Sequence, residues 1–314
     1  MLIANIEADE IINQITTSLT KREWKVQYNI GDEYDPIWGP ELNYKPRDKN
    51  KLKKIFRRLR FVDNVHYRLI QNVHYPSLAD CKMVFDVKMK SLHMQILWDD
   101  FTLWLGPDDG SNFRYKSAIT LPYKGTRGKK PEILVQFRQW LIDYREAVVI
   151  YGYEADDALG IYQNKDDEVI ETVAVHCDKD IFQIPGRHYD TYRNEFVNVG
   201  ELGKLTLESG KVRGTGLYFF YYQMLVGDIT DNIPPLVKGK GPVWAFNQLT
   251  YDGVSVEEED LLKSICKLYA QYLEIDWKKR LLEQADLVWI CRDKKEIGSI
   301  YILRRHRELF GDNL

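Results

Sequence analysis

The sequence has few of the features that mark secreted, membrane-spanning or zinc-binding proteins. Its four cysteines, Cys81, Cys177, Cys266 and Cys291, are far apart and form no Cys-X-X-Cys pair, which argues against a zinc site and a disulfide framework. None of the six histidines stands at a metal-binding spacing. The chain lacks an apolar run of about 18 residues and the basic start of a signal peptide. We therefore expect a cytoplasmic protein without membrane contact.

Composition is ordinary for a globular protein. Of its 314 residues, 44% are hydrophobic and 29% are charged, which suits one large domain with a smaller appendage. The formal net charge of -3 counts against a nucleic-acid partner, because phosphate binding rests on clustered Lys and Arg. The distribution of charge matters more than its sum, since acidic residues gather in short motifs and basic residues gather elsewhere.

Four apolar runs, over residues 2–6, 101–105, 147–151 and 172–177, predict strands that end in carboxylates. The acidic residues that follow them are Glu7, Asp9, Asp108, Asp109, Glu154, Asp156, Asp157, Asp178 and Asp180. Helical patterns over 79–96, 131–144 and 155–163 lie between strands, so we expect an α/β fold with a mainly parallel central sheet and flanking helices. Ligands bind outside the carboxyl ends of such strands, where these acidic residues converge.

Two regions depart from this alternation. Residues 21–80 predict inserted hairpins and loops, and residues 45–60 carry nine Lys or Arg against one Asp at spacings that suit an amphipathic helix. That helix either follows phosphates or is only a solvated surface. After about residue 200 the strand pattern fades, and residues 218–227, 243–249, 257–273 and 277–291 predict helices. We therefore divide the chain into an α/β domain over 1–200 and a helical domain over 201–314.

Clustered carboxylates suit a bound divalent cation. They repel one another and would take up protons unless a cation neutralises them. Oxygen ligands favour magnesium or manganese over zinc. Two magnesium ions about 3.5 to 4 Å apart could activate a water and orient a phosphodiester for in-line displacement. A single acidic pair is weak evidence because Asp often caps helices, but repetition at several strand ends favours phosphodiester hydrolysis.

Four motifs give a resemblance to the phage 5′-nucleases, a group similar to the 5′-nuclease domain of bacterial DNA polymerase I and to flap endonucleases. The motifs are Asn112-Phe113-Arg114 leading to Tyr123-Lys124-Gly125-Thr126-Arg127, then Glu154-Ala155-Asp156-Asp157, Asp178-Lys179-Asp180 and Gly227-Asp228-Ile229-Thr230-Asp231-Asn232-Ile233-Pro234. The match spans roughly residues 101–242. It implies a PIN-like 5′-nuclease fold, an arch segment over 111–145 and a helix-three-turn-helix motif within residues 227–249.

The resemblance implies roles for the motif residues. The metal ligands would be Glu154, Asp156, Asp157, Asp178, Asp180 and Asp231, with Asp228 close by, Asp108 or Asp109 before the arch, and Glu7 or Asp9 leading. Lys124 and Arg127 match the basic pair that contacts the scissile phosphate. Arg114 and the run Lys238-Gly239-Lys240-Gly241 are the expected DNA contacts, and the latter motif is also a weaker candidate for potassium.

The resemblance thus implies a magnesium-dependent 5′ to 3′ exonuclease or flap endonuclease, with manganese as an alternative ion. Its substrates would be DNA with 5′ ends, flaps or nicks, and RNA primers in RNA–DNA hybrids, during phage DNA replication by a monomer. A PIN-like ribonuclease would explain the acidic crevice but not the glycine-lysine run or the arch motif. A non-catalytic relative that binds branched DNA is favoured by Glu7 alone, where the family usually begins with Asp. Pro235 in place of a common Gly, and residues 21–80, also depart from the family.

Overall fold

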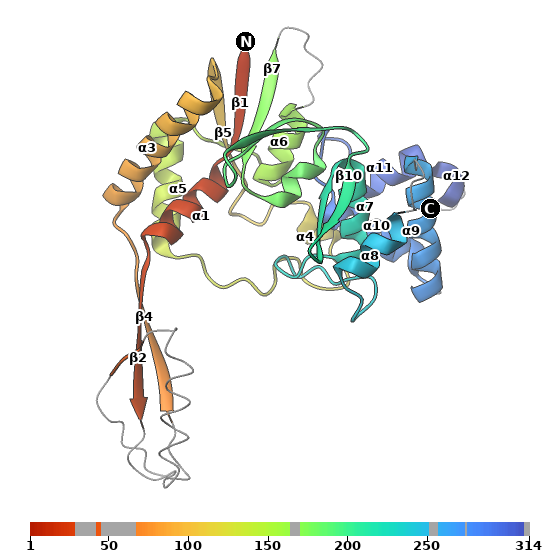
Figure 1. The fold of residues 1–314 in the computed structure, drawn as a ribbon, viewed down its shortest axis with the longest axis horizontal. Helices are drawn as coiled ribbons and strands as arrows, with labels where there is room; N and C mark the ends of the chain where they lie inside the picture. Colours follow the sequence, from red (N-terminus) through yellow and green to blue (C-terminus); the bar gives the residue numbers. More distant parts are fainter. Residues whose placement is uncertain (29–41, 45–66, 164–169, 251–256, 274, 311–314) are drawn as a thin grey trace.

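The computed structural model describes residues 1–28, 42–44, 67–163, 170–250, 257–273 and 275–310 (Figure 1). A sheet flanked by helices forms one side of the body, and the C-terminal helices lie beside it. The basic helix predicted over residues 45–60 lies outside the described residues. None of the described helices combines the length and the apolar character needed to cross a bilayer.

A six-stranded sheet with the order β6-β5-β1-β7-β8-β9 forms the centre of the α/β part. Its strands are β1 (Leu2–Glu7), β5 (Asp100–Leu105), β6 (Val148–Val149), β7 (Glu171–His176), β8 (Gly186–Asp190) and β9 (Glu195–Val199). Neighbours pair in parallel from β6 to β8, and only the edge strand β9 is antiparallel. The predicted α/β class with a mainly parallel sheet is confirmed, although β8 and β9 were not predicted.

Helices cover both faces of this sheet (Figure 1). The helices α1 (Ala8–Leu19), α3 (Leu78–Ile96) and α5 (Glu132–Arg145) pack on one face, in a core that includes Ile12, Phe85 and Leu141. On the other face α6 (Ala155–Gln163) buries Ala158 and Leu159. A capping box of Ser77 and Asp80 begins α3 by satisfying backbone N–H groups of its first turn.

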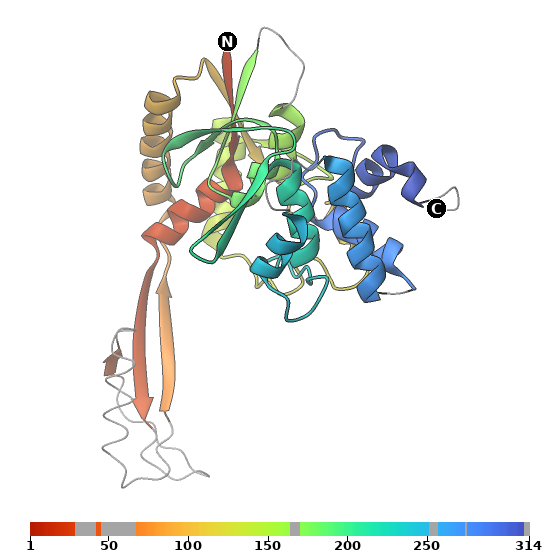
Figure 2. The same cartoon turned by 45° about the vertical axis from the view of Figure 1, so that its right-hand side comes forward.

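A small antiparallel sheet projects from the body between α1 and α3 (Figures 1 and 2). Strand β2 (Lys21–Tyr28) pairs with β4 (Tyr67–His74), from Lys21 opposite His74 to Tyr28 opposite Tyr67, and also with β3 (Leu42–Tyr44). Hairpins and loops were predicted within residues 21–80 without an assigned pairing, and the last residues of that range, from Leu78, belong to α3, whose helix was predicted from residue 79.

The described residues of the C-terminal part form helices and a hairpin. The helices are α7 (Gly216–Val226), α8 (Pro242–Leu249), α9 (Glu258–Leu273), α10 (Trp277–Val288), α11 (Gly298–Arg305) and α12 (Arg307–Phe310). The first four overlap the predicted segments, although α10 ends three residues before the predicted end at residue 291. The strands β10 (Lys204–Glu208) and β11 (Lys211–Thr215) show that the expected end of strands near residue 200 was wrong. Ser209 and Gly210 between them both have positive φ, which is the geometry of a two-residue hairpin turn.

Helix α7 is the centre of this C-terminal part. It is apolar on all sides, and Phe220, Tyr221 and Leu225 are buried among the surrounding helices. Gly227 ends the helix with a φ of 65°, and a Cβ added there would lie 2.4 Å from the carbonyl oxygen of Ile233. Glycine is therefore needed where the chain turns back from α7 toward the sheet.

Candidate functional site

A crevice of about 580 Å³ lies at the carboxyl ends of β1, β5 and β7. The parallel pairing of these strands explains why acidic residues far apart in sequence meet there. The crevice is lined by the predicted residues Glu7, Asp9, Asp108, Lys124, Arg127, Glu154, Asp156, Asp178, Asp180, Asp228 and Asp231. Two predicted ligands, Asp109 and Asp157, are not among its lining residues.

One side of the crevice, which we call the acidic wall, consists of Glu7, Asp156, Asp178 and Asp180. Glu7 ends β1, Asp156 stands in the first turn of α6, and the other two follow β7. The ion pairs among the described residues leave Glu7, Asp156 and Asp178 without a Lys or Arg partner. The positive ends of α1 and α6 begin directly beside these carboxylates and offset only part of their charge.

The acidic wall resists full ionisation. Burial, followed by the charges of Asp156 and Asp178, raises the pKa of Glu7 well above its usual value. Burial and then Asp178 raise the pKa of Asp156 in the same way, and raise that of Asp180 to about 6. Such a cluster stays ionised only if a cation compensates it.

The donor set of the acidic wall fits a hard divalent cation. Its ligand atoms are carboxylate oxygens, which magnesium and manganese prefer. Glu7 Oε2 is buried and has no hydrogen-bond partner among the described residues, so this oxygen has an unmet need for a ligand. Within the described part of the chain, no three His, Cys, Asp or Glu side chains are already arranged to hold a metal ion. Charge and chemistry fit, while the ligating geometry is not preformed.

Arg138 of α5 holds two of the predicted ligands away from this role. Its NH1 donates to Asp9 Oδ1 at 2.7 Å, and its Nε lies 2.8 Å from Asp108 Oδ2. Asp9 Oδ2 also accepts from the backbone N–H of Gly106 at 2.8 Å. Between the two leading ligands left open by the sequence, the geometry therefore favours Glu7 over Asp9. Arg138 was missed, although a basic residue at a buried position of a predicted helix was a visible signal.

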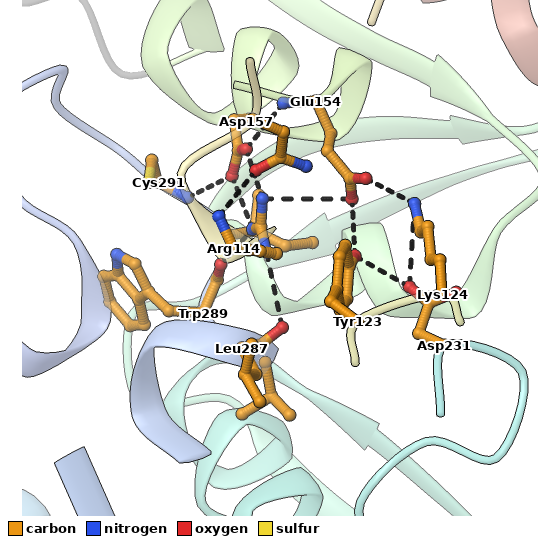
Figure 3. A network of polar contacts seen from close by, with 12 residues as sticks. Arg114, Tyr123, Lys124, Glu154, Asp157, Asp231, Leu287, Trp289 and Cys291 are labelled. Carbon is orange, nitrogen blue, oxygen red and sulfur yellow. Dashed lines mark hydrogen bonds and ion pairs between the residues drawn. The ribbon is translucent and has the colours of Figure 1, made fainter. Parts of the chain in front are cut away.

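A second part of the crevice, which we call the paired wall, consists of Lys124, Arg127, Glu154 and Asp231. Figure 3 shows Lys124, Glu154 and Asp231. Lys124 Nζ forms an ion pair with Glu154 and lies 3.7 Å from Asp231 Oδ2. Arg127 NH2 lies 2.5 Å from Asp231 Oδ1. Burial alone would raise the pKa of Glu154, but Lys124 and Arg114 outweigh it and lower that pKa to about 2. Each acid of this wall thus has a cation.

Tyr123 joins the two acids of the paired wall. Its hydroxyl lies 3.0 Å from Glu154 Oε2 and 2.8 Å from Asp231 Oδ2. One phenolic proton can be donated fully to only one carboxylate at a time. Tyr123 was quoted in the motif but not singled out, although a buried tyrosine needs a polar partner for its hydroxyl.

The backbone fixes the position of Lys124. This residue has a φ of 53°, in the left-handed region that side chains other than Gly seldom adopt. Its N–H donates to the carbonyl oxygen of Asp231 at 2.8 Å, and Asn232 Nδ2 donates to the Pro122 carbonyl at 2.9 Å. The segment from Pro122 to Lys124 and the turn after α7 are therefore tied together, which holds this unfavourable conformation in place.

Arg114 and Asp157 form a buried ion pair outside the crevice (Figure 3). The guanidinium donates to Asp157 at 2.6 and 2.8 Å and to the carbonyl oxygens of Leu287 and Trp289. Asp157 also accepts from the backbone N–H groups of Glu154 and Cys291, each at 2.9 Å. Its oxygens are fully used and Arg114 is inaccessible, so this geometry contradicts the predictions of Asp157 as a metal ligand and Arg114 as a DNA contact.

The remaining predicted residues lie at the rim or on the surface. Asp109 is exposed and accepts from the Ser111 N–H at 2.9 Å, so Asp108, which lines the crevice, is the better placed of the two alternatives. Asp228 lines the crevice and accepts from the Thr230 N–H at 2.7 Å. The run Lys238, Gly239, Lys240 and Gly241 is exposed and leads into the N-terminus of α8.

Glu10 is a further acidic residue of the crevice that the sequence analysis missed. It stands one helical turn after Glu7 and lines the crevice, and burial is the main cause that raises its pKa. Its Oε1 accepts from Cys177 Sγ at 3.3 Å. The spacing of three residues from Glu7 at a helix start was the signal that could have identified it.

No family model matches the chain, and no curated protein matches it. The crystal structure of the T5 D15 protein co-crystallized with metal ions is similar with a TM-score of 0.42 and 14% identity, over 92% of this chain and 94% of that chain. A likeness at this level carries no information about activity.

Proposed function

We propose that this chain is a magnesium-dependent nuclease, with manganese as an alternative ion, whose acidic wall binds the metal. The observation that carries the proposal is the charge division of the crevice. Glu7, Asp156 and Asp178 form no ion pair with Lys or Arg among the described residues, while Lys124 and Arg127 of the paired wall line the same crevice. When bound, divalent cations would polarise the phosphodiester and make a water more acidic.

The paired wall suits the stabilisation of a phosphate. Burial opposes the charge of Lys124, but Glu154 and Asp231 outweigh it and raise the lysine pKa, so the side chain stays protonated. Arg127 is half exposed and its charge is held by Asp231. A phosphate between the walls would replace part of these carboxylate contacts. The cations would then stabilise the charge that develops on its oxygens.

An exposed basic run before α8 supports duplex DNA as the substrate. The exposed run from Lys238 to Gly241 offers two cations and two glycines, and Gly241 precedes the N-terminus of α8. Backbone can approach phosphate closely at glycine, and a helix N-terminus favours anions. The motif resemblance adds the finer proposals of 5′ to 3′ exonuclease or flap endonuclease activity on 5′ ends, flaps, nicks and RNA–DNA hybrids. It also supports potassium at the α8 motif and a role in phage replication.

The test is a cleavage assay with 5′-labelled flap, nicked duplex, blunt duplex and single-stranded RNA, each with magnesium or with chelator. We expect magnesium-dependent cleavage of the flap and nicked substrates. The product ladder separates exonuclease from endonuclease action. Cleavage of RNA alone would instead indicate a PIN-like ribonuclease, and tight binding without products in magnesium or manganese would indicate a non-catalytic relative.

A further inference from the structure

The segment after α10 is held by side chains from the α/β part. Helix α10 ends at Val288, three residues before its predicted end, and the backbone of Trp289 is extended with ψ 132°. Arg114 binds the carbonyl oxygens of Leu287 and Trp289. The buried side-chain amide of Gln183 binds two further backbone groups of this segment, the Val288 carbonyl and the Ile290 N–H.

The Ile290 backbone fixes the orientation of this amide. Gln183 Oε1 accepts from the Ile290 N–H at 2.8 Å, and Nε2 donates to the Val288 carbonyl at 2.9 Å. A backbone N–H only donates and a carbonyl only accepts, so the opposite orientation of the amide would break both bonds. The second proton of Gln183 Nε2 is directed at Gln223 Oε1, 3.0 Å away.

The hydrogen bond from Gln183 also fixes the orientation of the Gln223 amide toward Asp180. Because its Oε1 accepts from Gln183, its Nε2 must be the atom that faces Asp180, where it donates to Oδ1 at 2.9 Å. Lys179 Nζ also lies 3.0 Å from Oδ1. Among the described residues, the hydrogen bonds to this carboxylate all end on Oδ1, which leaves Oδ2 to the crevice.

The amide of Gln223 is unusual in its surroundings. It is the single amide in α7, whose other buried side chains are apolar or aromatic. Burying a polar group is unfavourable unless its hydrogen bonds are satisfied, so an apolar side chain would pack here more simply. A fully connected pair of amides instead provides a fixed donor for one oxygen of Asp180.

We propose that Gln183 and Gln223 are positioning residues of the metal centre, which hold Asp180 Oδ1 so that Oδ2 stays available to a cation. They take their orientation from the backbone of Val288 and Ile290. The inference rests on the proposed metal centre. It also means that the C-terminal part completes this centre, in addition to any contact with DNA.

The test replaces Gln223 by Met, which keeps the length of the side chain and removes the amide. Manganese binding to the full chain is measured without nucleic acid, from the electron paramagnetic resonance signal of free Mn²⁺. We expect Q223M to bind about 10- to 100-fold more weakly, as for loss of an outer-shell partner. Q183M should also weaken Mn²⁺ binding, and this second variant provides the test if Q223M fails to fold.

Gln163 provides the matched control. It is also a buried amide, but it donates to the Thr172 and Arg187 carbonyls at the amino ends of the strands, away from the crevice. Q163M should lower the thermal unfolding temperature and leave Mn²⁺ affinity unchanged. Equal weakening in Q163M, or unchanged affinity in both Q223M and Q183M, would overturn the positioning role alone. A wild-type chain that binds no Mn²⁺ would overturn the proposed metal centre, and the positioning role with it.

Discussion

The two walls of the crevice differ in how the negative charge of their carboxylates is compensated. In the paired wall, Glu154 and Asp231 are neutralised by Lys124 and Arg127. In the acidic wall, Glu7, Asp156 and Asp178 have no such partner among the described residues. Lys124 and Arg127 therefore neutralise the paired wall, whereas among the described residues the acidic wall has a single ion pair, between Lys179 and Asp180. The positive charge that Glu7, Asp156 and Asp178 lack is of the kind that bound dications supply.

Neighbouring charge separates the walls more than burial does. Glu154 and Asp180 are both largely shielded from solvent, and the loss of hydration by itself raises the pKa of each carboxyl group. Lys124 and Arg114 reverse this for Glu154 and bring its pKa to about 2, whereas Asp178 reinforces it for Asp180 and brings its pKa to about 6. A carboxylate in this crevice thus takes its role from the groups that face it.

Removal of an acidic-wall residue should have the largest effect. We expect Asp156→Ala to lower turnover by more than the roughly 10- to 100-fold typical of an outer-shell residue, because a metal ligand is lost. DNA binding should survive. The check is the single-turnover rate in magnesium together with DNA affinity in chelator, with Asp109→Ala as the control outside the crevice. An unaltered rate in Asp156→Ala would remove the distinction between the walls.

Removal of a paired-wall cation should slow chemistry without preventing binding. We expect Lys124→Ala to reduce the single-turnover rate by about 10²- to 10³-fold, as for loss of one group that stabilises transition-state charge. Lys116→Ala, on the nearby α4 (Arg114–Ser117), is the control. If Lys124→Ala weakened substrate affinity and left the single-turnover rate unchanged, Lys124 would be a binding residue only.

Asp156 and Asp157 are adjacent, yet we expect opposite consequences from their substitution. Asp157→Asn removes the carboxylate that binds the buried Arg114 directly and leaves only the more distant Glu154, 3.8 Å away, so it should lower the free energy of unfolding by about 3–5 kcal/mol. Urea denaturation in chelator measures this, and Asp156→Asn serves as the control without such a loss. If Asp157→Asn instead kept full stability and lost Mn²⁺ binding, Asp157 would belong to the metal centre.

This pair also shows what the sequence could not disclose. The strands β1, β5 and β7 and the gathering of acids at their ends were predictable, because apolar runs and the carboxylates after them are local signals. Neighbouring residues of a helix point about 100° apart, so Asp156 faces the crevice while Asp157 faces the C-terminal part. The motif alone could not tell which side each would meet.

The cationic partners were equally hidden. Arg138 meets Asp9 across 129 residues, and Arg114 meets Asp157 across 43 residues, so no local spacing indicates either pair. The β10–β11 hairpin was different, because Ser209-Gly210 between two short polar-apolar alternations was a turn signal present in the sequence. Pairing across the fold was beyond sequence reasoning, while this hairpin was within its reach.

The pH dependence of stability should distinguish the walls by sign. The raised pKa of Asp180 gives stability that is present below 3.8 and lost as pH rises through about 6. The lowered pKa of Glu154 gives stability that is present above 4.5 and lost as pH falls toward 2. In chelator, the unfolding temperature should therefore fall between pH 5 and pH 8, and magnesium should raise it more at pH 8. Asp180→Asn should reduce this magnesium increment, and an equal increment at both pH values would contradict it.

The smallest effects are expected outside both walls, at Lys238 and Lys240. Each Ala substitution should remove about one phosphate contact and so reduce by about 1 the slope of log affinity against log salt concentration. The single-turnover rate at saturating DNA should stay unchanged, because neither side chain lines the crevice. Lys263→Ala on α9, where Lys263 pairs with Glu259, is the control. A slower chemical step in Lys238→Ala or Lys240→Ala would show that phosphate contacts at the α8 motif also set the geometry between the walls.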